Sequence, residues 1–222
     1  MWFVLAAFLL AWFVPLPRGH LWTLCWISFI AASLQYGLTF SGLALTAATP
    51  AVLLVQSEVI FGVIIAAILL GERPSLRQIL GIVMASCGVV VILGAPALEG
   101  QWLGIGLVLS GALVWAFGQV LIRRLDGALG GFQLTAWIGV MAGPQMLLAS
   151  CLIDGNPLPA IQAAPINAWL TVIYLGVVMT AIGYSAWYYV LARYPVPVVM
   201  PVLLLLPVAA IFGAVTMLGE VP

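Results

Sequence analysis

The stretch LLGERPS, residues 69–75, closes an apolar run with a Gly-Glu-x-Pro pattern, and the pattern returns as MLGEVP at residues 217–222. A shift of 148 residues superimposes the two copies without a gap. The same shift lays YGLTFSGLALTAA, which begins at Tyr36, over YSAWYYVLARYPV, which begins at Tyr184. The sequence therefore repeats itself internally, and the repeat extends well beyond the short acidic motif.

The composition places the chain in a lipid bilayer. Of its 222 residues, 65% are hydrophobic and 5% are charged, and the formal net charge is +0. A mean hydropathy of +1.28 excludes a water-soluble globule. The apolar stretches are about 20 residues long, which suits helices that cross a hydrocarbon core of roughly 30 Å. We expect an all-α polytopic membrane protein whose short loops leave no separate domain outside the membrane.

Breaks at charged residues, Pro and Gly divide the chain into eight expected spans. These are residues 1–14, 22–44, 50–70, 76–94, 102–122, 131–152, 166–190 and 197–218. The first span is short and lacks the charged start and cleavage site of a signal peptide, so we interpret it as the remaining part of a longer helix. Cys25, Cys87 and Cys151 fall inside spans without the spacing of a disulfide framework or a metal site, which predicts packing roles.

The positive charges predict the orientation of the chain. Four loops that would share one face contain all of them: Arg18, Arg73, Arg77, Arg123, Arg124 and Arg193. The loops expected on the opposite face contain no Lys or Arg, only Glu99 and Asp154. The positive-inside rule then places the arginine-bearing loops in the cytoplasm.

The repeat predicts the architecture. It relates spans 22–44 and 50–70 to spans 166–190 and 197–218 and crosses five helices, an odd number, so the two copies enter the membrane in opposite senses. Inverted repeats of this kind build many secondary transporters. We expect the full architecture to contain ten helices, of which eight are present here.

The two repeats are expected to share one membrane domain. The first is assigned to residues 1–94 and lacks its first helix, whereas the second is assigned to residues 102–222 and lacks its last helix. Whether the chain is a fragment or a naturally shortened protein is left open. Ser75 and Gln78 have the spacing of a capping box at the start of the span at 76–94, which favours a structural role for the motif around Glu72.

At this point the sequence resembles a known family. LLGERPSLRQILGIVMASCGVVVIL, residues 69–93, is similar to the end of the fourth helix and the fifth helix of the EamA family, in the drug/metabolite transporter superfamily. YLGVVMTAIGYSAWYYVLARYPVPVVMPVLLLLPVAAIF, residues 174–212, is similar to its eighth and ninth helices. VLLVQSEVIFGVI, TAIGYSAWYYVLARY and LLLLPV are most similar to the O-acetylserine/cysteine and amino-acid exporter branch.

The resemblance implies a function. Such proteins place a central cavity between two inverted halves and move small metabolites without ATP, so we expect an ATP-independent exporter of amino acids or related metabolites that works by alternating access. The alternatives are a non-transporting membrane assembly or receptor-like subunit, or an inactive transporter fragment. The expected location is a bacterial inner membrane. The expected partners are the lipid bilayer, a small metabolite and, as an option, a second copy in a homodimer, but not nucleic acid.

Enzymatic chemistry is not expected. The chain has one His, three scattered Cys and a single acidic residue in the middle of a span, which do not make an acid–base or metal constellation. The sequence also lacks the G-x-x-x-x-G-K-[ST] loop of a nucleotide-driven pump. We therefore predict no cofactor, no metal and no catalytic residue.

The acidic residue within a span is Glu58, the main candidate for the transport pathway. A carboxylate at that depth costs roughly 3 kcal/mol on insertion scales and needs a compensating environment. No Lys or Arg lies within a span to pair with it, which leaves protonation, water in a cavity, or hydrogen bonds. The functional interpretation is that Glu58 binds a substrate amine or a coupling proton, and the alternative is a protonated packing residue.

Helical spacing sets Thr180, Tyr184 and Trp187 on one stripe and Trp115 and Gln119 on another. These five and two further polar or aromatic side chains are candidates to line the pathway, with interhelical packing as the equal alternative. They are Gln56, Tyr36, Trp115, Gln119, Thr180, Tyr184 and Trp187. Gln56 lies about 200° around an ideal helix from Glu58, so the two are not expected on one narrow face. Pro144, Pro201 and Pro207 fall inside spans and are candidates for helix breaks that free backbone carbonyls.

Overall fold

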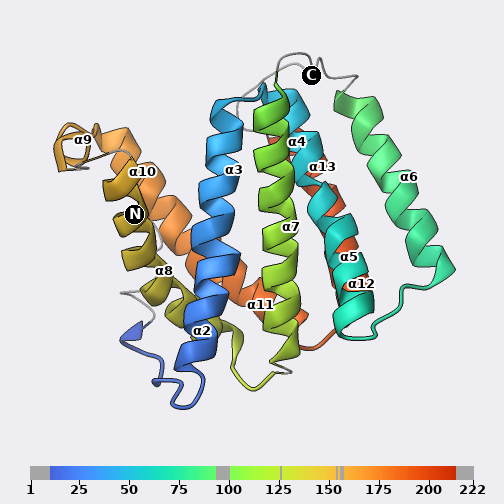
Figure 1. Cartoon of the computed structure of the whole chain (residues 1–222), viewed down its shortest axis with the longest axis horizontal. Helices are drawn as coiled ribbons and strands as arrows, with labels where there is room; N and C mark the ends of the chain where they lie inside the picture. Colours follow the sequence, from blue (N-terminus) through green and yellow to red (C-terminus); the bar gives the residue numbers. More distant parts are fainter. Residues whose placement is uncertain (1–10, 94–100, 126, 154, 156–157, 214–222) are drawn as a thin grey trace. The chain divides into compact units, whose positions relative to one another are not determined.

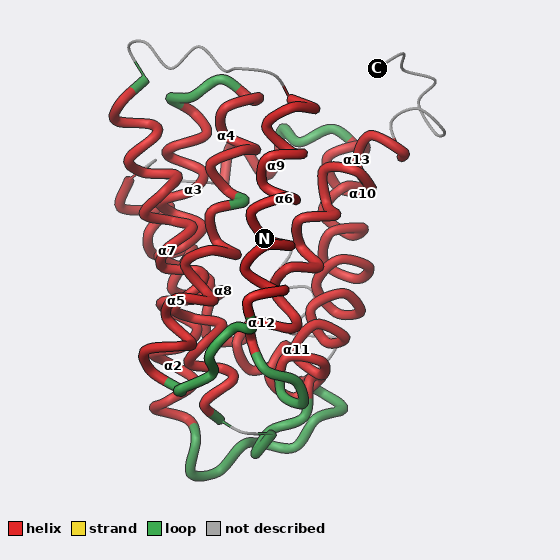
Figure 2. The backbone as a smooth tube through the Cα atoms, turned by 90° about the vertical axis from the view of Figure 1, so that its right-hand side faces the viewer, coloured by secondary structure: helices red, strands yellow, loops and turns green. Residues whose placement is uncertain are grey.

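The computed structural model describes residues 11–93, 101–125, 127–153, 155 and 158–213, and this part of the chain is all-helical (Figures 1 and 2). Most elements are α-helices, η1 and η2 are π-helices, and η3 is a 3₁₀-helix. In chain order they are α2 Leu21–Ser28, η1 Phe29–Leu34, α3 Gln35–Ala44, α4 Ala48–Val55, α5 Ser57–Leu69, α6 Leu76–Leu93, α7 Trp102–Arg124, α8 Gly131–Ile153, α9 Leu158–Gln162, α10 Ile166–Tyr174, η2 Leu175–Tyr184, α11 Ser185–Leu191, α12 Val196–Val199, η3 Met200–Leu205 and α13 Leu206–Gly213.

The predicted spans agree with these helices. Within the described part of the chain, five helices are long and apolar enough to cross a membrane: Leu21–Ala44, Ala51–Leu69, Trp102–Arg124, Gly131–Ile153 and Ile166–Leu191. The spans predicted at 76–94 and 197–218 overlap the shorter apolar helices Leu76–Gly88 and Val196–Ala209. Most of the span predicted at 1–14, and the second Gly-Glu-x-Pro copy with Glu220, lie outside the described residues. The sequence did not predict α9, a short helix in the loop before residue 166.

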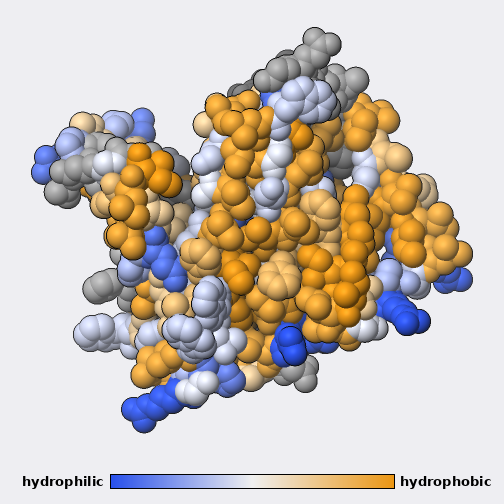
Figure 3. Space-filling view, in the orientation of Figure 1, coloured by the Kyte–Doolittle hydropathy of each residue, from blue (hydrophilic) through white to orange (hydrophobic). Residues whose placement is uncertain are grey.

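Large apolar side chains cover the helix surfaces, as Figure 3 shows for one face. Ile68, Val91 and Leu152 are each at least three quarters exposed. In water such a surface would cost about 25 cal/mol per Å² of apolar area, so it is suited to contact with acyl chains. The all-α polytopic membrane fold is therefore confirmed.

The chain divides into two compact units, each described here by itself. The first comprises Met1–Leu34 and Leu121–Arg193, and the second comprises Gln35–Val120 and Tyr194–Pro222. Each unit draws on both sides of the expected boundary between the repeats at residues 94–102. Grouping by contacts and grouping by repeat are different divisions, so the repeat assignment stays a prediction.

In the first unit α8 is the helix against which the others pack. It contacts α2, η1, η2 and α11. Near its start, a Cβ added to Gly131 would meet the backbone of Ser185 and Tyr189 in α11. The absence of a side chain at Gly131 therefore lets the backbones of α8 and α11 approach closely.

In the second unit α3 and α7 lie side by side and antiparallel (Figure 1). A Cβ added to Gly42 would lie 2.7 Å from Val108 Cγ2, and Cβ atoms added to Gly104 and Gly111 would meet Thr46 and Thr39 respectively. These contacts form one seam along the two helices. The small-residue approach typical of membrane helices is thus realised here at Gly104 and Gly111.

Four helical runs change type or break in their middle, and they pair under the repeat. The 148-residue shift carries residues 29–34 in η1 onto residues 177–182, which lie inside η2. It also carries Gln56, where α4 gives way to α5, onto Leu204 in η3. Because π-helices are rare and usually short, two of them at repeat-related positions support the predicted repeat.

Hydrogen bonds within each unit join segments that lie at the same predicted face of the membrane. In the first unit Gln133 Nε2 donates to the Pro15 carbonyl over 3.0 Å, and Arg123 donates to the Ala192 carbonyl over 2.7 Å. Pro15 and Ala192 lie in loops of the arginine-bearing face, and Gln133 and Arg123 lie near the adjoining ends of α8 and α7. In the second unit the Ala47 N–H donates to Gln101 Oε1 over 2.7 Å, which joins two loops that contain no arginine.

The predicted capping box at the start of α6 is confirmed. The Ser75 N–H donates to Gln78 Oε1 over 2.7 Å, and the Gln78 N–H donates to Ser75 Oγ over 3.3 Å. Gly71, with φ of 71°, makes the turn that precedes it. The Gly-Glu-x-Pro motif therefore reverses the chain between α5 and α6.

Candidate functional site

The site is built around the junction of α4 and α5 in the second unit. Gln56 ends α4 and precedes α5, and the Val59 N–H bonds to its carbonyl in a tight turn over 3.2 Å. Gln56 and Glu58 are 8% and 9% exposed, so both are buried. The protein therefore covers the α4–α5 junction on the sides of both residues, although the sequence assigned them to different faces of an ideal helix.

Glu58 belongs to the buried face of α5. That face also includes Val59, Gly62, Val63 and Ala66, and α5 packs against α12 and η3. No hydrogen bond or ion pair joins the Glu58 carboxylate to another described residue. A buried carboxylate in this setting is available to a cation or a proton that enters the membrane interior.

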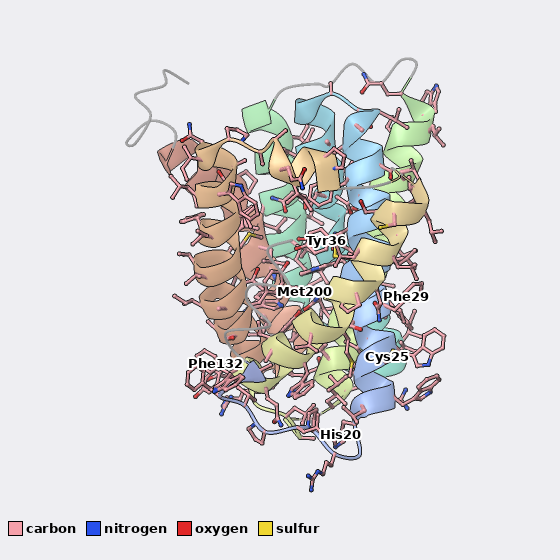
Figure 4. All side chains as sticks on the ribbon, turned by 90° about the vertical axis from the view of Figure 1, so that its left-hand side faces the viewer. His20, Cys25, Phe29, Tyr36, Phe132 and Met200 are labelled. Carbon is pink, nitrogen blue, oxygen red and sulfur yellow. The ribbon has the colours of Figure 1, made fainter. Side chains whose placement is uncertain are left out.

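Gly62 shows what Glu58 faces. It lies one helical turn after Glu58, and a Cβ added to it would collide with the Met200 side chain of η3. Met200, labelled in Figure 4, is completely buried. Residues four apart share a helix face, so the face of α5 that contains Glu58 is directed towards η3. Together α12, η3 and α13 form one helical run that begins at Val196.

Trp115 and Gln119 lie on the α7 face that contains Gly104 and Gly111, and both are buried. The same antiparallel register, extended by one turn, pairs position 35 of α3 with position 115 of α7. Gln35 is buried and donates to Thr39 Oγ1 over 3.1 Å, while its Oε1 atom accepts no hydrogen bond among the described residues. The sequence favoured the neighbouring Tyr36, but Gln35 is the more buried of the two.

Tyr36 is half-buried and stacks on Phe40, with ring centroids 5.6 Å apart. Tyr184, its partner in the repeat, is also half-buried and lies with its ring centroid 5.6 Å from that of Tyr188. The 148-residue shift carries Phe40 onto Tyr188 as well. The two repeat-related positions therefore each contact an aromatic ring one turn later within their own unit, stacked at 14° for Tyr36 and tilted at 44° for Tyr184.

The stripe predicted from Thr180, Tyr184 and Trp187 rested on α-helical spacing. Thr180 and Tyr184 instead lie in η2, where the Thr180 hydroxyl donates to the Leu175 carbonyl, five residues earlier, over 2.9 Å. Thr180 is buried, whereas Tyr184 and Trp187 are half-buried. A π-helix has more residues per turn, so the predicted alignment of these three side chains does not follow from their spacing.

The three prolines lie in different settings. Pro201 is the second residue of η3 and Pro207 is the second residue of α13, so the two prolines lie near the two ends of the 3₁₀ segment. Pro144 lies inside α8, which continues as an α-helix on both sides of it. The residue after it, Gln145, makes polar contacts that the sequence did not predict.

Gln145 is the centre of a polar cluster in the first unit. Its Oε1 accepts from the Ser33 hydroxyl over 2.7 Å, and its Nε2 donates to Ser28 Oγ over 3.2 Å. The Ser28 hydroxyl in turn donates to the Cys25 carbonyl over 2.8 Å. The Gln145 amide thus bridges the end of α2 and the interior of η1; Cys25 and Phe29 on this helix are labelled in Figure 4.

Glu72 makes a second contact that sequence reasoning missed. Its Oε2 accepts from the backbone N–H of Val196, the first residue of α12, over 2.6 Å. The two residues are 124 positions apart in the chain. No local signal predicts this bond, although the repeat relates the helix that ends before Glu72 to the run that begins at Val196.

A pocket in the second unit contains none of the residues predicted to line the transport pathway. It has a volume of about 430 Å³, lies between α5 and α7, and is entirely apolar. Its lining residues are Ile65, Ile68, Leu69, Leu113, Val114 and Phe117. A search of the described residues found no group of three or more His, Cys, Asp or Glu side chains that could hold a metal ion.

Comparison with known proteins gives the family. The family model described as the EamA-like transporter family matches residues 1–94 and 102–222. A probable amino-acid metabolite efflux pump of Salmonella typhimurium strain LT2 is 29% identical over 227 residues, which cover 98% of this chain and 76% of the relative. A pump of the same description from Escherichia coli strain K12 is 28% identical, with the same coverage.

A third relative aligns with this chain over a shorter stretch. A probable terminal-alkyne amino-acid exporter of Streptantibioticus cattleyicolor is 32% identical over 172 residues, which cover 77% of this chain and 56% of the relative. No solved structure matches the chain. The match to the family model covers both halves of the sequence, and the chain therefore belongs to the EamA-like transporter family.

Proposed function

We propose that the chain is a secondary, ATP-independent transporter that exports amino acids or related small metabolites, by alternating access between two inverted repeats. The observation that carries this proposal is the buried Glu58 carboxylate beside a helix interruption. Family membership and the names of the relatives, two amino-acid metabolite efflux pumps and an amino-acid exporter, support the direction and the substrate class.

The interrupted helices support a transport mechanism. Transporters of the inverted-repeat type place substrate and ion sites near broken helices at the bilayer midplane. Here the breaks at Gln56 and in η3 are repeat-related, and α5 packs against η3. A primary ammonium group of an amino acid, or a proton, is the chemical partner that a buried carboxylate would stabilise at this place.

The relatives and the loop charges also indicate the membrane, the orientation and the partners of the protein. The relatives are bacterial, so we propose the bacterial inner membrane, with the arginine-bearing loops in the cytoplasm. The proposed partners are the lipid bilayer and a small metabolite. A homodimer is a further option. No step of this transport requires a catalytic residue or a cofactor.

Counterflow in proteoliposomes tests the function directly. The purified chain is reconstituted into vesicles loaded with an unlabelled amino-acid mixture, and uptake of radiolabelled L-cysteine and O-acetyl-L-serine is followed. A transporter gives transient accumulation of label above equilibrium without ATP. Vesicles with heat-inactivated protein are the control, and a non-transporting subunit or inactive fragment would give the same trace as that control.

A further inference from the structure

Glu72 joins two helices that the sequence separates widely. Its carboxylate accepts the Val196 N–H over 2.6 Å, at the first residue of α12 and directly after Pro195. The Pro195 backbone is extended, with φ of −57° and ψ of 142°, so the chain enters the helix at Val196. The first N–H groups of a helix have no partner within it, and a carboxylate is the strongest side-chain acceptor for them.

The helical run that begins at Val196 has few other ways to fix its start. α12 has four residues, contains Pro197, and passes directly into the 3₁₀ segment η3. No side chain of its own N-cap residue, Pro195, bonds to its backbone. Short helical pieces with prolines have little stability by themselves, so an external carboxylate has a large share in positioning this run.

The position of this run determines the surroundings of Glu58. Met200 is fully buried and lies against Gly62, one turn from Glu58. Met200 follows Val196 by four residues, about one helical turn. A displacement of the Val196 end would therefore move Met200 along the Glu58 face of α5.

We infer that Glu72 is a positioning residue of the transport pathway, which holds the start of α12 so that Met200 is seated on Gly62 beside Glu58. The Gly-Glu-x-Pro motif therefore does more than reverse the chain between α5 and α6. Its carboxylate also fixes the helical run that begins at Val196, which the repeat relates to α4 and α5. This inference rests on the proposed function, since it assumes that substrate is handled at Glu58.

A double-mutant cycle removes the hydrogen bond from each side. Glu72→Gln keeps an acceptor oxygen of the same size and removes the charge. Val196→Pro removes the donor, and the backbone tolerates it because Pro suits a first helical position and the extended Pro195 suits the residue before a proline. The matched control is Arg73→Gln, an exposed charge change in the same loop.

The readouts are counterflow of O-acetyl-L-serine, as half-saturating concentration and maximal rate per amount of protein, and hydrogen exchange of the Val198 and Val199 amides in lipid nanodiscs. We expect the half-saturating concentration to rise about 3- to 10-fold in Val196→Pro and less in Glu72→Gln, as for loss of a charge-assisted bond. The double variant should match Val196→Pro alone, Arg73→Gln should match the parent, and exchange should become faster at α12.

Several results would overturn the inference. Additive effects of the two substitutions would show that they do not act through one bond. A lower maximal rate with unchanged half-saturating concentration would indicate a purely structural role. If Val196→Pro does not reach the membrane, Glu72→Asp, which withdraws the carboxylate by one methylene, replaces it and must give the same shift.

Glu58→Gln is measured in the same series to separate this inference from the proposed function. If Glu58→Gln slows counterflow while the Glu72 and Val196 variants match the parent, the positioning role fails and the proposed function stands. If Glu58→Gln transports like the parent, the pathway assignment fails, and the positioning role fails with it.

Discussion

The Ser33 hydroxyl donates a hydrogen bond of 2.7 Å to the side-chain carbonyl of Gln145, across 112 positions of the chain. Together with the bond from Gln145 to Ser28, it connects α8 to both sides of the point where α2 becomes a π-helix. The π register needs such support because its hydrogen-bond geometry is less favourable than that of an α-helix. Gln145 therefore stabilises one particular form of this helix.

Gln145→Leu should loosen the η1 segment without preventing folding. Interhelical hydrogen bonds in membranes contribute about 0.6 kcal/mol on average, so loss of two of them should lower the thermal midpoint by a few degrees at most. Hydrogen exchange at residues 29–34 should become faster. Ser110→Ala is the control, since the Ser110 hydroxyl donates to the Gly106 carbonyl of its own helix. Equal exchange in both variants would contradict the assignment.

Gly104→Ala and Gly111→Ala should damage the α3–α7 seam. A Cβ at either position would meet backbone and threonine atoms of the facing segment, so the helices must separate. We expect each substitution to destabilise the protein by about 1–3 kcal/mol, seen as lower membrane abundance and a lower midpoint in thermal aggregation.

Gly106→Ala is the matched control, because nothing lies within 4 Å of a Cβ added there. It should be neutral or slightly stabilising, since Ala is the better helix former. If Gly104→Ala and Gly106→Ala behaved alike, the seam would not be a packing contact.

Gly62→Ala should be milder than the seam variants. The atoms that its Cβ would meet belong to the flexible end of the Met200 side chain, which can change rotamer at a smaller cost than a backbone. Met200→Ala removes the colliding atoms but leaves a cavity of its own, so rescue is measured in that background, where Gly62→Ala should cause no further fall in the thermal midpoint. A lack of rescue would show that the collision with Met200 is not what limits Gly62→Ala.

The orientation is tested with single cysteines in a background where Cys25, Cys87 and Cys151 are replaced. Arg193→Cys should react with a membrane-impermeant maleimide only after the cells are permeabilised, because the arginine-bearing loops are expected in the cytoplasm. Ala164→Cys, in a loop without arginine, should react in intact cells. The reverse pattern would invert the proposed topology.

Some features of the fold could be predicted from the sequence because their signals are local. The length of the apolar stretches predicted the spans, and the spacing of Ser75 and Gln78 predicted the capping box. Both signals depend on residues close together in the chain. The π-helices could not be predicted in this way. FIAASL in η1 and LGVVMTAIGY in η2 have no common motif, and both segments pack against α8, which is distant in the sequence.

The site was predicted less completely for the same physical reason. Glu58 was identified because a carboxylate in an apolar span is costly wherever the chain folds. The Glu72 to Val196 bond and the Gln145 cluster join residues more than 100 positions apart, and no periodicity within one helix reports such contacts. Gln35 was passed over because the repeat favoured Tyr36, whereas burial favours the amide.

The most direct test of the central claim is the efflux rate of Glu58→Gln at matched membrane abundance. The substitution keeps the shape of the side chain and removes its charge. Ser57→Ala is the neighbouring control, because the Ser57 hydroxyl donates to the Leu54 carbonyl of the same run. We predict that Glu58→Gln lowers efflux of radiolabelled amino acids at least 10-fold, by about 1.4 kcal/mol or more in the barrier, while Ser57→Ala stays near the parent. Parental efflux from Glu58→Gln at normal abundance would contradict the account.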